Sequence, residues 1–275
     1  PIDDSGLNDW GLWGHPSYVW ADSSTNEWSW KSARSNYYTA LTAASDMNRK
    51  TALANSFRAI GQVMHLVEDL AVPAHTRNDG HNPDGFEKYA DTHALNLFYY
   101  VPFANSGTSI SPYAPKQFWD SETYNGTNPS GSNTQGLAEY TNANFFSEDT
   151  VANNSFPYPK IYTETIIDIR SITNANTGQT NPRMYYTKKY DGETNNGQGY
   201  LLSTVALLND WRDRVMPIAT PDQPFYPVLD ENVYKDYASL LIPRAVGYSA
   251  GLINYFFRGD IDLQEGTSGH LIINN

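Results

Sequence analysis

Apolar residues recur at helical spacing through the first hundred positions of the chain. The spacing predicts a helix over 29–44, a longer one over 48–72 and a third over 86–100. In the second of these, apolar side chains return every three or four residues, which predicts a core-facing stripe. The stripe consists of Leu53, Phe57, Ile60, Met64 and Val67. Pro73 follows and is expected to end that helix.

The rest of the chain alternates between helical and strand-like patterns. Further helices are predicted over 137–146, 199–216 and 231–257, the last bent at Pro243. Aromatic and β-branched residues in 162–169 and 183–190, followed by a turn at Asp191-Gly192, predict a small antiparallel insertion within 160–200. The polar segment 104–136 predicts a long surface loop.

Together these patterns predict a mainly α fold. We expect a multi-helix domain over 1–258 that carries the β insertion at 160–200. Residues 259–275 are expected to form a tail, or the start of a further β module, because 260–263 and 271–273 resemble strands without an obvious partner. The longest apolar stretch, 238–257, contains Pro243, Arg244 and Asn254, which indicates a buried core helix rather than a transmembrane segment.

Charge and composition narrow the classes of function. The formal net charge is −12, which disfavours a large surface for polyanions such as nucleic acid. There are no cysteines, so a metal ion can be held only by His, carboxylate, backbone or water oxygen. The low proportion of charged residues, 17%, together with many polar uncharged ones, suggests a secreted or cell-surface protein.

Five potential metal ligands lie within 27 residues: His65, Asp69, His75, His81 and Glu87. His65 and Asp69 are four residues apart in a predicted helix, so their side chains share one face. Imidazole and carboxylate together suit zinc, with manganese or iron as alternatives, and Asp69 could bridge two ions. The competing interpretation is that each histidine caps a helix or bonds a carbonyl, and His93 is assigned to such a packing or capping role.

The string Gly61-x3-His65-x3-Asp69-x3-Pro73-x-His75 resembles the signature of the zinc-dependent phospholipases C and the related zinc-dependent single-strand nucleases. The segment that contains Glu87 resembles the glutamate-bearing helix of that family, and His81 matches the histidine before it. The residues from Arg244 to Phe257 are similar to the family's closing helix.

The resemblance implies a mainly helical fold that holds up to three zinc ions, with His65, Asp69, His75, His81 and Glu87 as ligands. It also implies further ligands before Pro1, among them the catalytic aspartate, which we expect this chain to lack. No catalytic or substrate-binding residue is therefore assigned.

Three functions stay open. The first is a secreted zinc-dependent phosphoesterase in which metal-bound hydroxide attacks a phosphodiester of the phospholipid type, with the headgroup as ligand. The second is a single-strand nuclease, ranked lower because 30 acidic residues outnumber 18 basic ones. The third is a catalytically incomplete extracellular module for binding or assembly, with the C-terminal tail as a self-assembly element.

Overall fold

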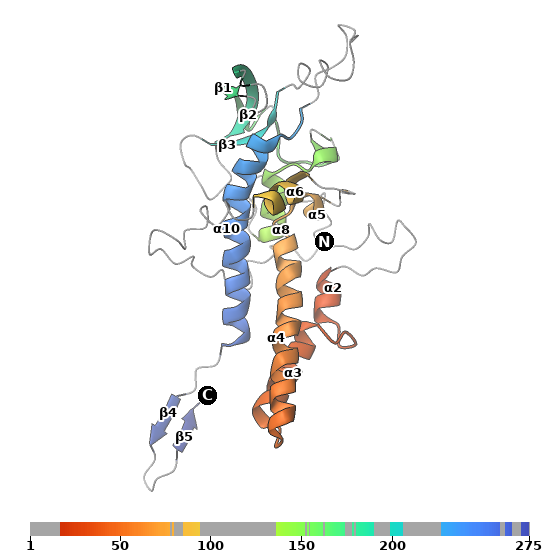
Figure 1. Cartoon of the computed structure of the whole chain (residues 1–275), viewed down its shortest axis with the longest axis vertical. Helices are drawn as coiled ribbons and strands as arrows, with labels where there is room; N and C mark the ends of the chain where they lie inside the picture. Colours follow the sequence, from red (N-terminus) through yellow and green to blue (C-terminus); the bar gives the residue numbers. More distant parts are fainter. Residues whose placement is uncertain are drawn as a thin grey trace.

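The computed structural model describes seven α-helices, a three-stranded sheet and a two-stranded hairpin (Figure 1). The residues that it describes are 17–77, 79, 85–93, 136–151, 153, 155–161, 163–173, 178, 180–189, 199–205, 227–258, 262–265 and 271–274.

Two long helices, α4 (Asp46–Asp69) and α10 (Glu231–Phe256), run side by side along the long axis of the molecule (Figure 1). Ser45 caps the start of α4, and Asp230 caps α10 by accepting hydrogen bonds from the amides of Asn232 and Val233. Helix α10 continues through Pro243. None of the described helices has a stretch that is both long and apolar enough to cross a membrane.

Helix α3 (Trp30–Thr42) is joined to α4 by the short connection 43–45, and the two helices form a hairpin. The contact between them uses small residues, because Ala33 and Ala59 are fully buried there beside Ile60. The Ser56 hydroxyl donates a 3.0 Å hydrogen bond to the Ala33 carbonyl. Small side chains let the two helix backbones approach closely. The short helix α2 (Ser17–Asp22) lies against this pair.

The sheet consists of β1 (Thr165–Thr173), β2 (Thr180–Lys188) and β3 (Tyr200–Thr204) in that spatial order, with both pairings antiparallel. Strand β3 packs on α10, and all five of its residues are buried. Every residue of the short helix α8 (Leu137–Asn144) is also buried. One apolar core therefore unites the helices with the sheet; its members include Val63, Val67, Phe86, Leu137, Phe145, Tyr185, Leu201, Leu202, Val233, Tyr237 and Leu241.

A polar network ties strand β2 to the start of α10. The Asp230 carboxylate accepts a 2.6 Å hydrogen bond from Arg183 Nη1 and a 2.9 Å bond from the Tyr185 hydroxyl. Burial, reinforced by the negative charge of Asp230, raises the pKa of Tyr185 to about 12. The tyrosine therefore stays a neutral donor at physiological pH, and one carboxylate holds the sheet and caps the helix together.

The expectation of a mainly α fold with a small antiparallel β insertion is wrong. A three-stranded antiparallel sheet forms part of the main core, where Tyr185, Leu201 and Leu202 are fully buried. The predicted helix over 199–216 begins instead with strand β3, and residues 206–216 lie outside the described ranges. The reason is physical: a strand buried on both faces has no polar alternation, so its apolar run looks like part of a buried helix.

The predicted stripe on α4 is partly wrong. Ile60 and Val67 are buried, but Leu53 and Phe57 are exposed. The buried face instead runs through smaller residues, namely Ala52, Ser56, Ala59, Ile60, Val63 and Val67. Apolar spacing alone favours the larger side chains, whereas the close approach of α3 selects the small ones.

Five of the described helices were predicted from the sequence, whereas the short helices Ser17–Asp22 and Pro73–Thr76 were not. The predicted helices include those where α3, α4, α8 and α10 lie, and α6 (Gly85–Thr92) is the described part of the one predicted over 86–100. The expectation that the tail strands lack a partner is wrong, since β4 (Asp262–Glu265) pairs antiparallel with β5 (Leu271–Asn274). The loop predicted over 104–136 lies outside the described residues except for Gly136. The domain boundary at residue 258 stays a prediction.

Replacing Tyr237 with Phe should lower the free energy of unfolding by about 1–3 kcal/mol. The Tyr237 hydroxyl is fully buried, donates a 2.7 Å bond to the Leu202 carbonyl and accepts one of 3.1 Å from the Phe146 amide. Without this hydroxyl, the Leu202 carbonyl in the sheet and the Phe146 amide after α8 each lose a hydrogen-bond partner. Urea unfolding measures the change, with Tyr38→Phe as control because Tyr38 is 69% exposed. Equal stabilities of the two variants would contradict this role.

Candidate metal centre

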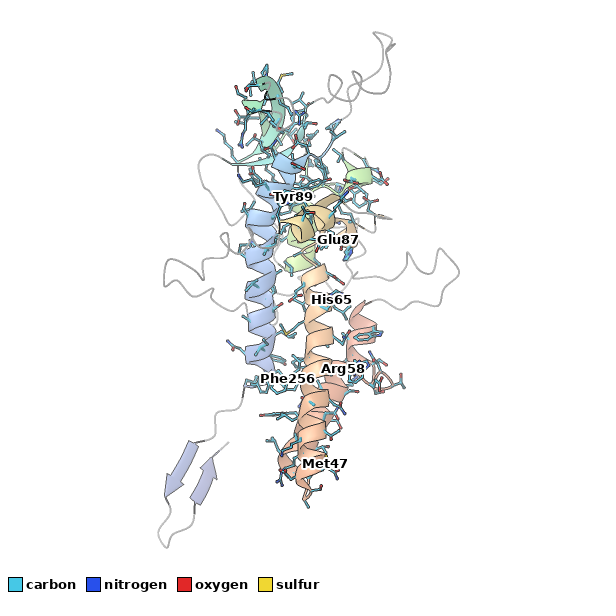
Figure 2. The ribbon with its side chains drawn as sticks, in the orientation of Figure 1. Met47, Arg58, His65, Glu87, Tyr89 and Phe256 are labelled. Atoms are coloured by element: carbon cyan, nitrogen blue, oxygen red, sulfur yellow. The ribbon has the colours of Figure 1, made fainter. Side chains whose placement is uncertain are left out.

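Three helices bring four potential metal ligands together. The C-terminal half of α4 carries His65 and Asp69, the four-residue helix α5 (Pro73–Thr76) carries His75, and α6 carries Glu87. Figure 2 shows His65 partway along α4 and Glu87 near its C-terminal end. His81 lies outside the described residues.

His75 is at the centre of this group. Its Nδ1 lies 3.6 Å from Asp69 Oδ1, and its Nε2 lies 3.3 Å from Glu87 Oε1. The other oxygen of Asp69, Oδ2, lies 3.8 Å from His65 Nε2. The side chain of His75 is only 10% exposed and that of Asp69 12%, whereas that of His65 is 70% exposed. The four side chains therefore form a row whose middle members, His75 and Asp69, are buried and whose two ends, Glu87 at 42% and His65 at 70%, reach solvent.

The position of α5 depends on a buried arginine directly after it. Arg77 Nη1 donates hydrogen bonds to the carbonyls of Asn142 (2.7 Å) and Tyr158 (3.0 Å), and its Nε donates to Thr150 Oγ1 (2.6 Å). Asn142 returns a 2.8 Å bond to the Thr76 carbonyl. Pro73 at the start of α5 and Arg77 just past its end thus fix the turn that holds His75.

Helix α6 is fixed at its first residue, Gly85. A Cβ atom there would overlap the carboxylate of Glu148, in the 3₁₀-helix η2 (Glu148–Thr150), and the hydroxyl of Tyr234 on α10. These two groups are hydrogen-bonded to each other across the glycine. The absence of a side chain at Gly85 therefore lets α6 lie against α10, with Phe86 buried and Glu87 facing His75.

The donor set fits zinc in its chemistry, since imidazole nitrogen and carboxylate oxygen are both common zinc ligands. Two atoms bound to one zinc ion in tetrahedral geometry are about 3.3 Å apart. The separation of His75 Nε2 and Glu87 Oε1 matches that spacing, and the other two pairs are slightly wider. Within the described ranges, no three His, Asp or Glu side chains converge on a common point at metal-binding distance.

The arrangement is best described as two donor pairs joined through one contact. One pair is His75 Nε2 with Glu87, and the other is His65 with Asp69. Asp69 faces Nδ1 of His75, which is the side from which a carboxylate commonly orients a histidine in metal sites. The predicted ligands other than His81 are thus close neighbours, as their spacing in the sequence suggested.

Two further positions near the ligand segment, His93 and Gly61, lie outside the group of four candidate ligands. The assignment of His93 to packing is confirmed, because its ring stacks on Tyr89 at 4.2 Å and its Nδ1 lies 2.9 Å from the Tyr89 carbonyl. Gly61, the first residue of the motif, is exposed, and nothing lies within 4 Å of the position that a Cβ atom would take there. Its role in the site is therefore not supported by packing.

Sequence reasoning missed the residues that position the ligands. Asn142 and Glu148 act on α5 and α6 from more than sixty residues away along the chain, and Arg77, directly after α5, bonds to equally distant residues. Nothing in their local sequence distinguishes them from exposed polar residues. The signal that was available is Arg77 itself, a charged residue two positions after a candidate ligand.

No protein-family model matches this chain, and no curated protein or solved structure shows significant similarity to it. The interpretation of the centre therefore depends on its own residues.

Replacing Gly85 with Ala should lower the free energy of unfolding by about 1–3 kcal/mol, because the added methyl group displaces Tyr234 or Glu148. The matched control is Gly61→Ala, in the exposed interior of α4, which should stabilise by about 0.5–1 kcal/mol. Urea unfolding of the two variants measures both effects. If both variants gained stability, the packing at Gly85 would not be the constraint described.

Proposed function

We propose that this chain binds zinc at the cluster formed by His65, Asp69, His75 and Glu87 and serves as a metal-dependent phosphodiester hydrolase acting on phospholipid-type substrates. The observation that carries the proposal is the position of His75. A nine-tenths-buried imidazole lies between two carboxylates contributed by two other helices, α4 and α6. Such a convergence costs desolvation of polar groups unless they are paired or bind a cation.

The four residues would have different roles in binding the cation. Nε2 of His75 and the Glu87 carboxylate would be ligands, and Asp69 would orient His75 from its Nδ1 side. His65 lies at the open end, where its exposed side chain faces the solvent from which a substrate arrives. Zinc bound there supplies Lewis-acid stabilisation of the negative charge on a phosphoryl oxygen.

The class of substrate follows from charge and from the resemblance to zinc-dependent phospholipases C. The ligand segment carries Glu68, Asp69 and Glu87, which repel a long polyanion but tolerate a single phosphodiester once a cation is bound. This ranks a phospholipid headgroup or another small phosphodiester above single-stranded nucleic acid. Secretion remains part of the same proposal and is supported by composition alone.

Zinc should stabilise the protein, and His75→Ala should remove that effect. At a free zinc concentration a hundredfold above Kd the stabilisation is about 2.7 kcal/mol. The control is His93→Ala, which changes a histidine of the same sequence cluster that stacks on Tyr89 instead of facing a carboxylate. Each variant is compared with its own metal-free form by thermal unfolding, and bound zinc is counted by elemental mass spectrometry.

The two histidine variants separate metal binding from general damage. Because His75 is buried, its removal is expected to cost stability even without metal, so only the zinc-induced increment is diagnostic. Loss of that increment in both variants, or in neither, would contradict the assignment of His75 as a ligand.

Hydrolysis of a phosphodiester is expected to require bound zinc. The zinc-loaded protein is expected to cleave a chromogenic phosphocholine diester, and Glu87→Gln should reduce kcat/KM by at least about tenfold because it removes an anionic ligand. Product release is followed by absorbance, with single-stranded DNA as the competing substrate. A protein that binds zinc through His75 but cleaves neither substrate would instead be the binding or assembly module.

A further inference from the structure

The end of the α3–α4 hairpin exposes large apolar side chains. We define this hairpin tip as residues 38–50, which comprise the last turn of α3, the connection 43–45 and the first turn of α4. Tyr38 is 69% exposed, Leu41 65% and Met47 72%. Figure 2 shows Met47 at the far end of the two helices. Large apolar residues at such exposure mark interaction surfaces when they gather on one feature.

The hairpin is also positively charged in an acidic protein. Residues 30–58 contain five Lys and Arg, namely Lys31, Arg34, Arg49, Lys50 and Arg58, and a single acidic residue, Asp46. Asp46 is shared by Arg49 and Lys50, at 3.2 Å and 2.9 Å. Even with Asp22 and Glu27 of the preceding segment included, the hairpin stays positive, whereas the whole chain carries −12. The tip itself carries a net charge of +1, from Arg49, Lys50 and Asp46, and Lys31, farther along the hairpin, is paired with Asp22 at 2.8 Å.

We propose that the hairpin tip docks on an anionic lipid bilayer. Apolar side chains that enter the interface, with basic residues beside them at the level of the headgroups, are the combination that binds peripheral proteins to acidic membranes. A tyrosine at this position suits the interface, since its ring is apolar and its hydroxyl stays hydrated. The basic hairpin is complementary to such a surface, and the acidic remainder of the chain is repelled from it.

A lipid surface fits this feature better than a second copy of the chain. A stable protein interface needs about 800 Å² from each partner, whereas the tip is the narrow end of two helices with three separate apolar side chains. Shallow insertion into a fluid interface needs no complementary shape. Self-association through the tip is therefore an outcome that would overturn the proposal.

The docking surface is separate from the candidate metal centre. Met47 and His65 are eighteen residues apart on the same straight helix, which at 1.5 Å per residue places them about 27 Å from each other. Vesicle binding therefore does not depend on the proposed hydrolase activity, and it should be unchanged when zinc is removed with a chelator.

The test is cosedimentation of the full chain with vesicles of phosphatidylcholine alone or mixed with phosphatidylserine. We expect binding to the mixed vesicles that weakens as salt rises. The triple variant Tyr38→Ser, Leu41→Ser and Met47→Ser should bind at least about tenfold more weakly. The matched control is Ile169→Ser, because Ile169 is as exposed as Leu41, at 65%, but lies on the sheet.

Two further measurements keep the result decisive. Circular dichroism verifies that the triple variant keeps its helices, which is expected because all three side chains are exposed. Sedimentation velocity compares the oligomeric state of the two variants. Equal vesicle binding by the triple and control variants, no binding to anionic vesicles, or a monomerisation caused by the tip variant would each overturn the proposal.

Discussion

The packing of helix α10 against α4, α6, α8 and β3 is the constraint on which the rest of the structure depends. Its buried face supplies Val233, Tyr237 and Leu241 to the core. Tyr237 also bonds to a carbonyl of β3 and an amide after α8, so one hydroxyl joins the sheet to a helix. Because α10 touches all four of these elements, displacement of α10 would separate the sheet from the helices that carry the candidate ligands.

The positions of the candidate ligands depend on the packing of α10 and its neighbouring elements. His75 is fixed by Arg77 through α8 and the 147–158 region, and Glu87 is fixed by Gly85 against α10, while Asp69 ends the long helix α4. Asp69, His75 and Glu87 therefore stand on three different elements, each with its own support. Ligands supported in this way can be preorganised, so that binding a cation requires little rearrangement.

The sequence predicted best those features that depend on local spacing. The i, i+4 spacing predicted that His65 and Asp69 share a helix face, and the structure has the two side chains in contact. Pro73 was expected to interrupt the helix, and a new short helix begins there. Features set by distant contacts were missed: the buried strand Tyr200–Thr204 looked helical, and Leu53 was chosen for the core over Ala52. The role of Arg77 was not predicted because its partners, such as Asn142, lie more than sixty residues away along the chain.

The distance along the chain between α4 and α10 affects how the protein is made. Ser249 bonds to Glu68 across 181 residues, and the contacts of α10 with α4 span a similar distance. At a synthesis rate of about 5–20 residues per second, roughly ten to forty seconds separate the emergence of the two helices from the ribosome. During that interval the buried face of α4 has no α10 to cover it, so its apolar residues stay available for aggregation. The α3–α4 hairpin can form early, because its contacts are local, but completion of the core must wait until the last helix has been synthesised.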